Sequence, residues 1–239
     1  MELSDQGAEM TTKEHYLRDG SIVHDPRLGR LLQPDERNFA YPVRSTIKRN
    51  VPRSYTWRGE VVLDQGTEGS CVGHAFAHRL IHRPVERKGI RHTDAVRYYK
   101  AAQDIDPWPG NDYEGTSILA GAKAVIREGL AASYCWAPTL EDLILGVGYH
   151  GPAVMGTWWW SEMSNPAVNG ALTVGGRRLG GHAYLLHGVN LRQKIFFGTN
   201  SWGRNWGVQG YFTISFADAE RLLLDHGEAC FLHEVPRKR

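Results

Sequence analysis

The stretch Asp64-Gln65-Gly66-Thr67-Glu68-Gly69-Ser70-Cys71-Val72-Gly73-His74-Ala75-Phe76 decides how the rest of the chain is interpreted. A glycine-rich loop leads into an apolar segment with helical spacing, and Cys71 lies where the two meet. Backbone N–H groups are unpaired at the start of a helix and the helix dipole is positive there, so both favour a thiolate. Because the thiolate is the nucleophilic form, we predict that Cys71 is reactive and that the Gln65 amide can donate a hydrogen bond beside its sulfur.

The composition allows a sizeable core and excludes some partners. The 239 residues are enough for one large domain or two small lobes, and 41% of them are apolar. A net charge of +2 is too close to neutral to indicate a nucleic-acid or membrane partner. The chain begins with charged residues and lacks the apolar core of a signal peptide, and no apolar run reaches membrane-spanning length. We therefore expect a cytoplasmic protein that binds neither nucleic acid nor membranes.

The three cysteines indicate a reducing compartment. An odd, low count does not resemble the disulfide framework of a secreted domain. A disulfide between Cys135 and Cys230 is disfavoured but stays open.

Residues 1–51 differ from the remainder of the chain. They are charged, with scattered apolar residues and several turn formers, and they have neither helical nor strand periodicity. They are interpreted either as an arm on the surface or as a pro-segment that covers an active-site cleft. Extended peripheral segments are common, which favours the arm.

The periodicity changes from helical to strand-like along the remaining chain, 52–239. The predicted helices are 71–83, 94–103, 117–128 and about 139–146, and one more at 217–226. The predicted strands are 152–160, 171–174, 183–190, 194–199, 211–215 and 229–235, and residues 58–63 are interpreted as a short strand or an extended lead-in. Helices followed by strands indicate an α+β protein with two lobes, 52–150 and 151–239, which together form one domain.

Two stretches of the second half can supply the partners of a nucleophilic thiol. His182 begins one strand of the predicted hairpin and Asn200 ends the other, so antiparallel pairing brings them close. The Asn200 oxygen can then hold one imidazole nitrogen while the other faces the Cys71 thiolate, as in a cysteine hydrolase. Trp202 can shield this hydrogen bond from water. Each residue alone has a simpler explanation, such as a buried cysteine, a core histidine or a turn, but three such contexts in one chain favour the catalytic interpretation.

In these residues and their spacing, the chain resembles the papain-like cysteine peptidases. The motifs that carry the resemblance are Gln65 to Cys71, Gly181-His182-Ala183, Asn200 to Gly203, Trp206-Gly207 and Gly210-Tyr211-Phe212. They cover about 52–214. Glu68 replaces the family's usual cysteine before the nucleophile, and Val72 replaces the tryptophan after it. These departures resemble a disulfide-poor bacterial or viral branch.

The resemblance implies a fold and a reaction. The fold is a papain-like two-lobed fold, with a helical left lobe, an antiparallel β-barrel-like right lobe and the active-site cleft between them. The reaction is thiol-dependent peptide hydrolysis without a cofactor. Cys71 attacks the carbonyl, His182 transfers protons, Asn200 orients His182, and the Gln65 amide with the Cys71 backbone N–H forms the oxyanion hole.

The resemblance also places substrate-binding residues and a substrate. Glu114-Gly115-Thr116 resembles the glycine segment that pairs with an extended substrate backbone, a form of strand addition. Gly69, Gly181 and Trp202 are assigned to the same cleft. The expected partner is a peptide or protein substrate, and the expected state is a monomer.

The histidines of the predicted helix 71–83 do not indicate a metal site. His74, His78 and His82 recur every four residues, which can place zinc ligands on one helix face. No Glu follows His74, so the His-Glu-x-x-His pattern of zinc peptidases is absent. We predict no metal and interpret the three histidines as a solvated or partly buried helix face.

Two other functions stay open. A binding protein can keep the papain scaffold without cleaving anything, although the complete set of catalytic residues argues against this. An isopeptidase or a transferase can use the same triad, because the acyl-enzyme step is common to all of these reactions.

Overall fold

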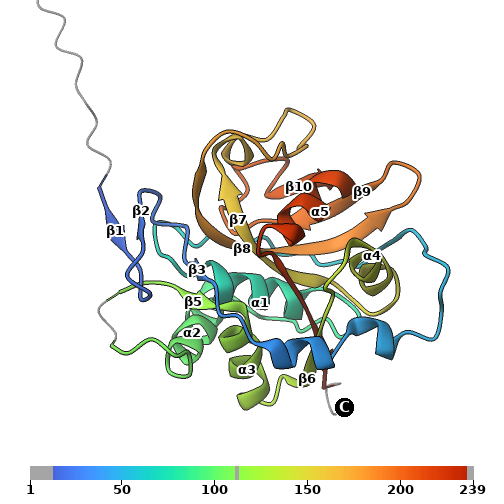
Figure 1. The fold of residues 1–239 in the computed structure, drawn as a ribbon, viewed down its shortest axis with the longest axis horizontal. Coiled ribbons are helices and arrows are strands. Elements are labelled where there is room, and N and C mark those ends of the chain that lie inside the picture. Colours follow the sequence, from blue (N-terminus) through green and yellow to red (C-terminus); the bar gives the residue numbers. More distant parts are fainter. Residues whose placement is uncertain (1–12, 111–112, 236–239) are drawn as a thin grey trace, which may run out of the picture.

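The structure is a computed structural model and describes residues 13–110 and 113–235. Figure 1 shows a group of helices on one side of the molecule and most of the strands on the other. No helix among these residues is long and apolar enough to span a membrane.

The helical part consists of α1 (Cys71–Ile81), α2 (His92–Gln103) and α3 (Ile118–Arg127), close to the predicted helices. Every residue of α1 is buried, so this helix is the central one. Helix α3 begins one residue later than predicted. The Ser117 hydroxyl caps it by accepting from the Ala120 N–H, whereas the Thr116 hydroxyl donates to Asp106 at 2.8 Å. Asp106 thus draws Thr116 away from the capping position.

The sheet contains seven strands, in the order β10-β9-β8-β7-β11-β6, with β4 beside β8, and all its pairs are antiparallel. Its strands are β4 (Tyr55–Thr56), β6 (Ala131–Trp136), β7 (Ala153–Trp160), β8 (Arg178–Asn190), β9 (Ile195–Thr199), β10 (Tyr211–Ser215) and β11 (Glu228–Glu234). The predicted hairpin is formed by β8 and β9. Helices α4 (Leu140–Tyr149) and α5 (Phe216–Leu224) complete this part of the molecule. The α+β class and the two-part architecture are confirmed.

Three strand predictions differ from the structure. Residues 58–63 form no strand; the Leu63 N–H instead donates to His78 Nε2 of α1 at 2.9 Å. In 171–174 only Ala171 makes a β-bridge, to Thr213. Strand β6 was not predicted. It is a strand because it pairs with β11, far along the chain, and the β-propensity of its own residues contributes less.

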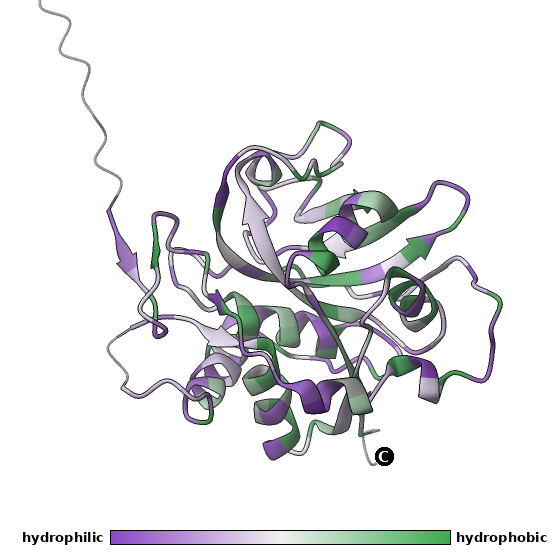
Figure 2. Cartoon of the chain, in the orientation of Figure 1, coloured by the Kyte–Doolittle hydropathy of each residue, from purple (hydrophilic) through white to green (hydrophobic). Residues whose placement is uncertain are grey.

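The sheet separates two hydrophobic cores. One face of the sheet packs on α1 and α3 through residues such as Val154 and Leu185. The opposite face packs on α4 through Leu143 and Val147 of that helix. Figure 2 shows hydrophobic residues concentrated along α1 and the central strands. Because β6 and α4 pack with the sheet although they precede residue 150, a single division at 150 does not separate the two parts.

The N-terminal segment is built into the fold. It contains the hairpin β1 (His15–Tyr16) and β2 (Ile22–Val23), the strand β3 (Arg30–Leu31), and two short 3₁₀ turns, Glu36–Ala40 and Val43–Thr46. Strand β3 pairs in parallel with β5 (Thr116–Ser117), as Figure 1 shows. The side chains of Leu28, which precedes β3, and of Leu31 are buried in the hydrophobic core that also contains Leu143 and Val147. A purely peripheral arm, the interpretation favoured by the sequence, does not describe this segment.

Candidate active site

Cys71 is the first residue of α1, as predicted, and it is fully buried. Burial raises the pKa of the Cys71 thiol to about 11, and the backbone of Gly29 and Ala183 and the charge of Arg30 oppose this rise without cancelling it. Burial of the thiol therefore opposes the thiolate that the sequence predicts. Desolvation outweighs the favourable position at the helix start.

His182 and Asn200 form the predicted pair. His182 Nε2 lies 2.8 Å from Asn200 Oδ1, which also accepts from the Ser201 N–H at 2.8 Å. The Ser201 contact identifies the Asn200 oxygen, so His182 Nε2 carries the proton. His182 Nδ1 is buried and makes no hydrogen bond of good geometry among the described residues, although the Arg27 backbone lies close enough to raise the pKa of His182. Burial lowers the pKa of His182 to about 4, against the opposing effect of the Asn200 hydrogen bond.

Two tryptophans exclude water from the histidine–asparagine pair. The Trp202 ring lies 4.9 Å from the His182 ring, between centroids, as expected from the sequence. The Trp159 ring lies edge-on at 4.8 Å and is completely buried. Trp159 was not singled out from the sequence, because it is one of three consecutive tryptophans on a strand. Strand alternation is the signal that distinguishes it, since Trp158 and Trp160 are only partly buried.

Gln65 is held next to this pair. Its Oε1 accepts from Ser201 Oγ at 2.6 Å, and its backbone N–H donates to the Ser201 carbonyl at 2.8 Å. Its Nε2 donates to the Glu68 carbonyl at 2.7 Å and to the Arg27 carbonyl at 3.0 Å. Ser201 thus joins the Gln65 loop to Asn200, and the amide that the sequence assigns to an oxyanion hole already binds a carbonyl oxygen.

The three predicted cleft glycines lie around the N-terminal segment. A side chain at Gly29 would overlap the Gly69 carbonyl, and a side chain at Gly181 would overlap the Arg30 carbonyl. Gly115 has a φ of +93°, and its N–H donates to Tyr99 Oη at 2.8 Å. The next residue makes the strand contact, with the Thr116 N–H donating to the Gly29 carbonyl at 2.9 Å.

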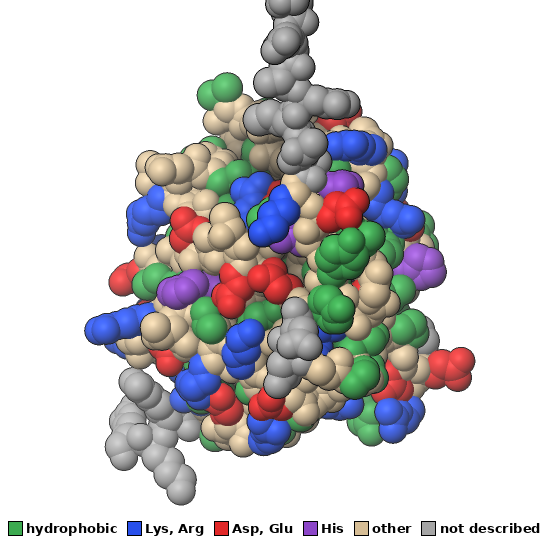
Figure 3. Space-filling view, turned by 90° about the vertical axis from the view of Figure 1, so that its left-hand side faces the viewer, with side chains coloured by type: hydrophobic (Ala, Val, Ile, Leu, Met, Phe, Trp, Pro, Cys, Tyr) green, Lys and Arg blue, Asp and Glu red, His purple; other side chains and the backbone are tan. Residues whose placement is uncertain are grey.

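Residues 25–31, here called the cleft segment, therefore lie over Cys71. The Arg27 guanidinium stacks 3.7 Å above the Trp202 ring. Surface hollows adjoin the segment on two sides, one lined by Pro26 and Trp202 and the other by Arg30 and Trp158. Figure 3 shows the face that carries the N-terminal hairpin, where basic and acidic side chains are interspersed. The sequence left open that residues 1–51 cover an active-site cleft, but it did not single out 25–31, because the contacts of this segment join distant parts of the chain.

The helix α1 histidines do not converge on a common point. They are fully buried rather than solvated, and each has its own partner. His74 contacts His92 at 3.0 Å, His78 accepts from Leu63, and His82 Nδ1 lies 2.8 Å from the His78 carbonyl.

A different trio has ligand atoms within 4.8 Å of one another, namely Cys135, His150 and His233. Both nitrogens of His150 already have partners, the Thr46 hydroxyl and the Leu232 carbonyl. After burial, the charge of Arg79 also lowers the pKa of both histidines, which indicates a positive potential where a cation would bind. We assign no metal here. Cys135 itself is a free thiol, as is Cys230.

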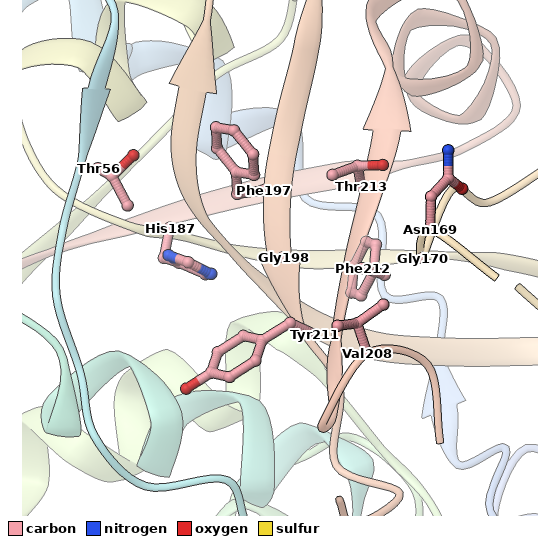
Figure 4. A pocket seen from close by; sticks show the side chains of 10 residues that line it. All are labelled: Thr56, Asn169, Gly170, His187, Phe197, Gly198, Val208, Tyr211, Phe212 and Thr213. Atoms are coloured by element: carbon pink, nitrogen blue, oxygen red, sulfur yellow. The ribbon is translucent and has the colours of Figure 1, made fainter. Parts of the chain in front are cut away.

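A pocket away from Cys71 lies between β4, β8, β9 and β10. Figure 4 shows His187, Phe197 and Tyr211 around it, with Thr56 on one side. Burial lowers the pKa of His187 to about 3. No carboxylate or thiol lines this pocket, so it lacks a nucleophile such as the Cys71 thiol.

No family model matches the chain. A 40-residue stretch is 42% identical to an uncharacterized peptidase C1-like protein of Acanthamoeba polyphaga mimivirus, over 17% of this chain and 13% of the viral protein. The chain thus matches only a small part of that relative.

Solved structures match over most of the chain. Xylellain, a cysteine protease from Xylella fastidiosa, has a TM-score of 0.67 and 18% identity, over 87% of this chain and 97% of its own. The ragweed pollen allergen Amb a 11, a cysteine protease solved in its proform, has a TM-score of 0.57 and 19% identity, over 83% of this chain and 72% of its own. The fold is therefore that of the papain-like cysteine proteases.

Proposed function

We propose that the protein is a papain-like cysteine peptidase. The observation that carries the proposal is the hydrogen-bonded unit of His182, Asn200, Ser201 and Gln65, together with a buried thiol at the start of α1 that the backbone of Ala183, next to His182, contacts. This unit orients a base, fixes its tautomer and presents an amide donor. These are the groups that acyl transfer to a cysteine requires.

The reaction follows from these positions. His182 Nδ1, the ring nitrogen that Asn200 does not hold, takes the proton of Cys71 Sγ, and the thiolate attacks the peptide carbonyl carbon. The carbonyl oxygen becomes negative and accepts from Gln65 Nε2 and the Cys71 backbone N–H. His182 then protonates the departing amine, and water hydrolyses the thioester with His182 as base.

We also propose that the described form is latent and that the cleft segment blocks the site. The Arg27 carbonyl accepts a hydrogen bond from Gln65 Nε2, the donor that the oxyanion would need, and the Gly29 backbone contacts the Cys71 thiol. A peptide substrate needs this same space. The expected substrate is a peptide or protein. The expectations of a monomer, of no nucleic-acid partner and of a cytoplasmic location rest on the sequence and the free thiols.

Inhibitor labelling tests the peptidase proposal. An epoxysuccinyl thiol-protease inhibitor is incubated with the reduced protein, with and without mild conditions that loosen the cleft segment, and adducts are mapped by mass spectrometry. We expect one adduct on Cys71 and none in the variant His182→Ala. An absence of adduct together with no turnover of a peptide pool would refute the proposal.

Product analysis separates the related activities. Hydrolysis of linear peptides supports a peptidase, cleavage of lysine-linked branches alone supports an isopeptidase, and amide formation with an added amine supports a transferase. If Cys71→Ala retains the full biological effect of the protein, a binding function on the same scaffold is correct instead.

A further inference from the structure

The side chain of Arg30 fills an enclosed space beside Cys71. It is completely buried, and its charge acts on the Cys71 thiol. Its Nε and one terminal nitrogen lie 3.2 and 2.5 Å from a carboxylate oxygen of Glu228, and the same terminal nitrogen donates to the His226 carbonyl at 2.9 Å. A guanidinium from the cleft segment therefore ends in an acidic recess of the catalytic domain.

Glycines make room for this side chain. A Cβ at Gly156 would lie 3.0 Å from Arg30 Nε, and a Cβ at Gly181 would lie 3.2 Å from Arg30 Cδ. The Trp158 ring flanks the guanidinium at 5.9 Å. We call this space, between Glu228, the His226 carbonyl, Gly156 and Trp158, the Glu228 pocket.

The acidic end of the pocket has one cation partner. Among the described residues, Glu228 pairs with Arg30 alone. The Glu228 side chain is only 13% exposed, and burial raises the pKa of its carboxyl while the charge of Arg30 opposes the rise. When the cleft segment leaves, this carboxylate loses its counter-ion inside a largely dry space. A buried charge without a partner is costly, so the empty pocket favours a cationic side chain.

We propose that Glu228 is a specificity-determining residue that selects an arginine side chain of the substrate in the Glu228 pocket, and that Arg30 imitates this side chain. The inference rests on the proposed peptidase function. Arginine fits better than lysine, because two of its N–H groups meet the carboxylate while a third contact reaches the His226 carbonyl. An aliphatic side chain would leave Glu228 unpaired and is disfavoured.

Matched active-site probes test this specificity on the full-length chain. The variant Arg30→Ala removes the ion pair that anchors the cleft segment, so we expect the segment to leave the cleft more readily and the emptied Glu228 pocket to admit a probe. Peptidyl acyloxymethyl ketones carry arginine, lysine or norleucine at each of the two positions before the reactive group. The second-order rate of Cys71 labelling is followed by intact-protein mass spectrometry, in Arg30→Ala alone and combined with Glu228→Gln or with Glu220→Gln, an exposed control on α5.

At one of the two positions we expect arginine to react at least about tenfold faster than norleucine in Arg30→Ala, with lysine between them. Glu228→Gln should remove that preference by slowing labelling with arginine and speeding labelling with norleucine, because the buried charge that disfavours an aliphatic side chain is gone. Labelling of the variant by the norleucine probe also shows that it is folded. Glu220→Gln should keep the preference. If Glu228→Gln does not fold, Glu228→Met provides the same comparison.

The outcomes distinguish the inference from the function on which it rests. Equal rates for arginine and norleucine, or an arginine preference that survives both Glu228 substitutions, would overturn the inference and leave the peptidase intact. If no probe labels Cys71 while iodoacetamide does, the proposed function fails, and the inference fails with it.

Discussion

The Cys71 thiol and the His182 imidazole are both neutral near pH 7 in this structure. Burial raises the pKa of Cys71 to about 11 and lowers that of His182 to about 4. A peptidase of this kind reacts as a thiolate beside an imidazolium. These pKa shifts support the proposal that the described form is latent, with the cleft segment contributing by excluding water.

Alkylation of Cys71 is expected to report this state. In the intact chain, the rate with iodoacetamide should stay low from pH 6 to 9 and rise only toward pH 11, because a raised pKa leaves little thiolate at neutral pH. Site-resolved mass spectrometry measures the rate, with buried Cys230 as the internal reference. Rapid alkylation of Cys71 at pH 7 in the folded protein would contradict the assignment of a neutral thiol.

Gln65 is expected to affect the rate more than the binding of substrate. In the Arg30→Ala background, Gln65→Ala should lower kcat about 10²–10³-fold with a smaller change in KM, because the lost donor acts on the developing oxyanion. Steady-state kinetics on a fluorogenic peptide measure both constants. Gln193→Ala, an exposed glutamine in the β8–β9 turn, is the matched control. A kcat within about threefold of the parent would exclude Gln65 from the oxyanion hole.

At the scale of elements, strand β3 occupies the place that strand addition by a substrate requires. It pairs with β5 through the Thr116 N–H and packs against Gly69 and Gly181. The sequence anticipated an extended chain along the cleft glycines. It named the N-terminal segment as a possible cover of the cleft but favoured a surface arm, because a two-residue strand without periodicity has no local signature.

Gly29 provides a way to displace this element. Gly29→Ala adds a methyl group that would overlap the Gly69 carbonyl, a backbone atom that cannot move aside easily, so the segment must shift. We expect peptidase activity to rise, measured as the initial rate on a fluorogenic peptide. Ser21→Ala, an exposed change in the same hairpin region, should leave the rate unchanged. A folded Gly29→Ala protein with unaltered activity would indicate that the segment does not block the site.

The helices were more predictable than the strands. Thr139 caps α4 as expected, because its hydroxyl accepts from the Asp142 N–H, and a cap of this kind is a local property. Strand β6 was missed, and of the two alternatives for residues 58–63 the strand is wrong, since both outcomes depend on partners distant in the chain. Local chemistry thus predicts where helices begin, and packing decides which extended segments become strands.

At the scale of the whole molecule, several histidines are buried in the neutral form. Burial lowers the pKa of His74, His82, His150 and His182 to about 4 and that of His187 to about 3. In the unfolded chain each has a pKa of about 6.5. As the pH falls from about 6.5 toward 4, the unfolded state therefore takes up protons first, and the folded state loses stability.

Urea unfolding at a series of pH values measures this effect. The free energy of unfolding should fall steadily between pH 6.5 and 4.5, by roughly 1–2 kcal/mol for each such histidine at pH 5 as an upper limit. His187→Gln should make the decline shallower, because it removes one of these groups. An unfolding free energy that is constant over this range would contradict the neutral burial of the histidines.

The sequence by itself determined the candidate catalytic groups and the α+β class. Cys71, His182 and Asn200 could be found because each lies in a short motif whose glycines, strand ends and helix start are local features. Only the tertiary structure decided that the cleft segment covers Cys71, that the thiol is neutral, and that Arg30 meets Glu228, 198 residues away. The physical reason is that burial and ion pairing depend on which distant surfaces come together, and no spacing along the chain records this.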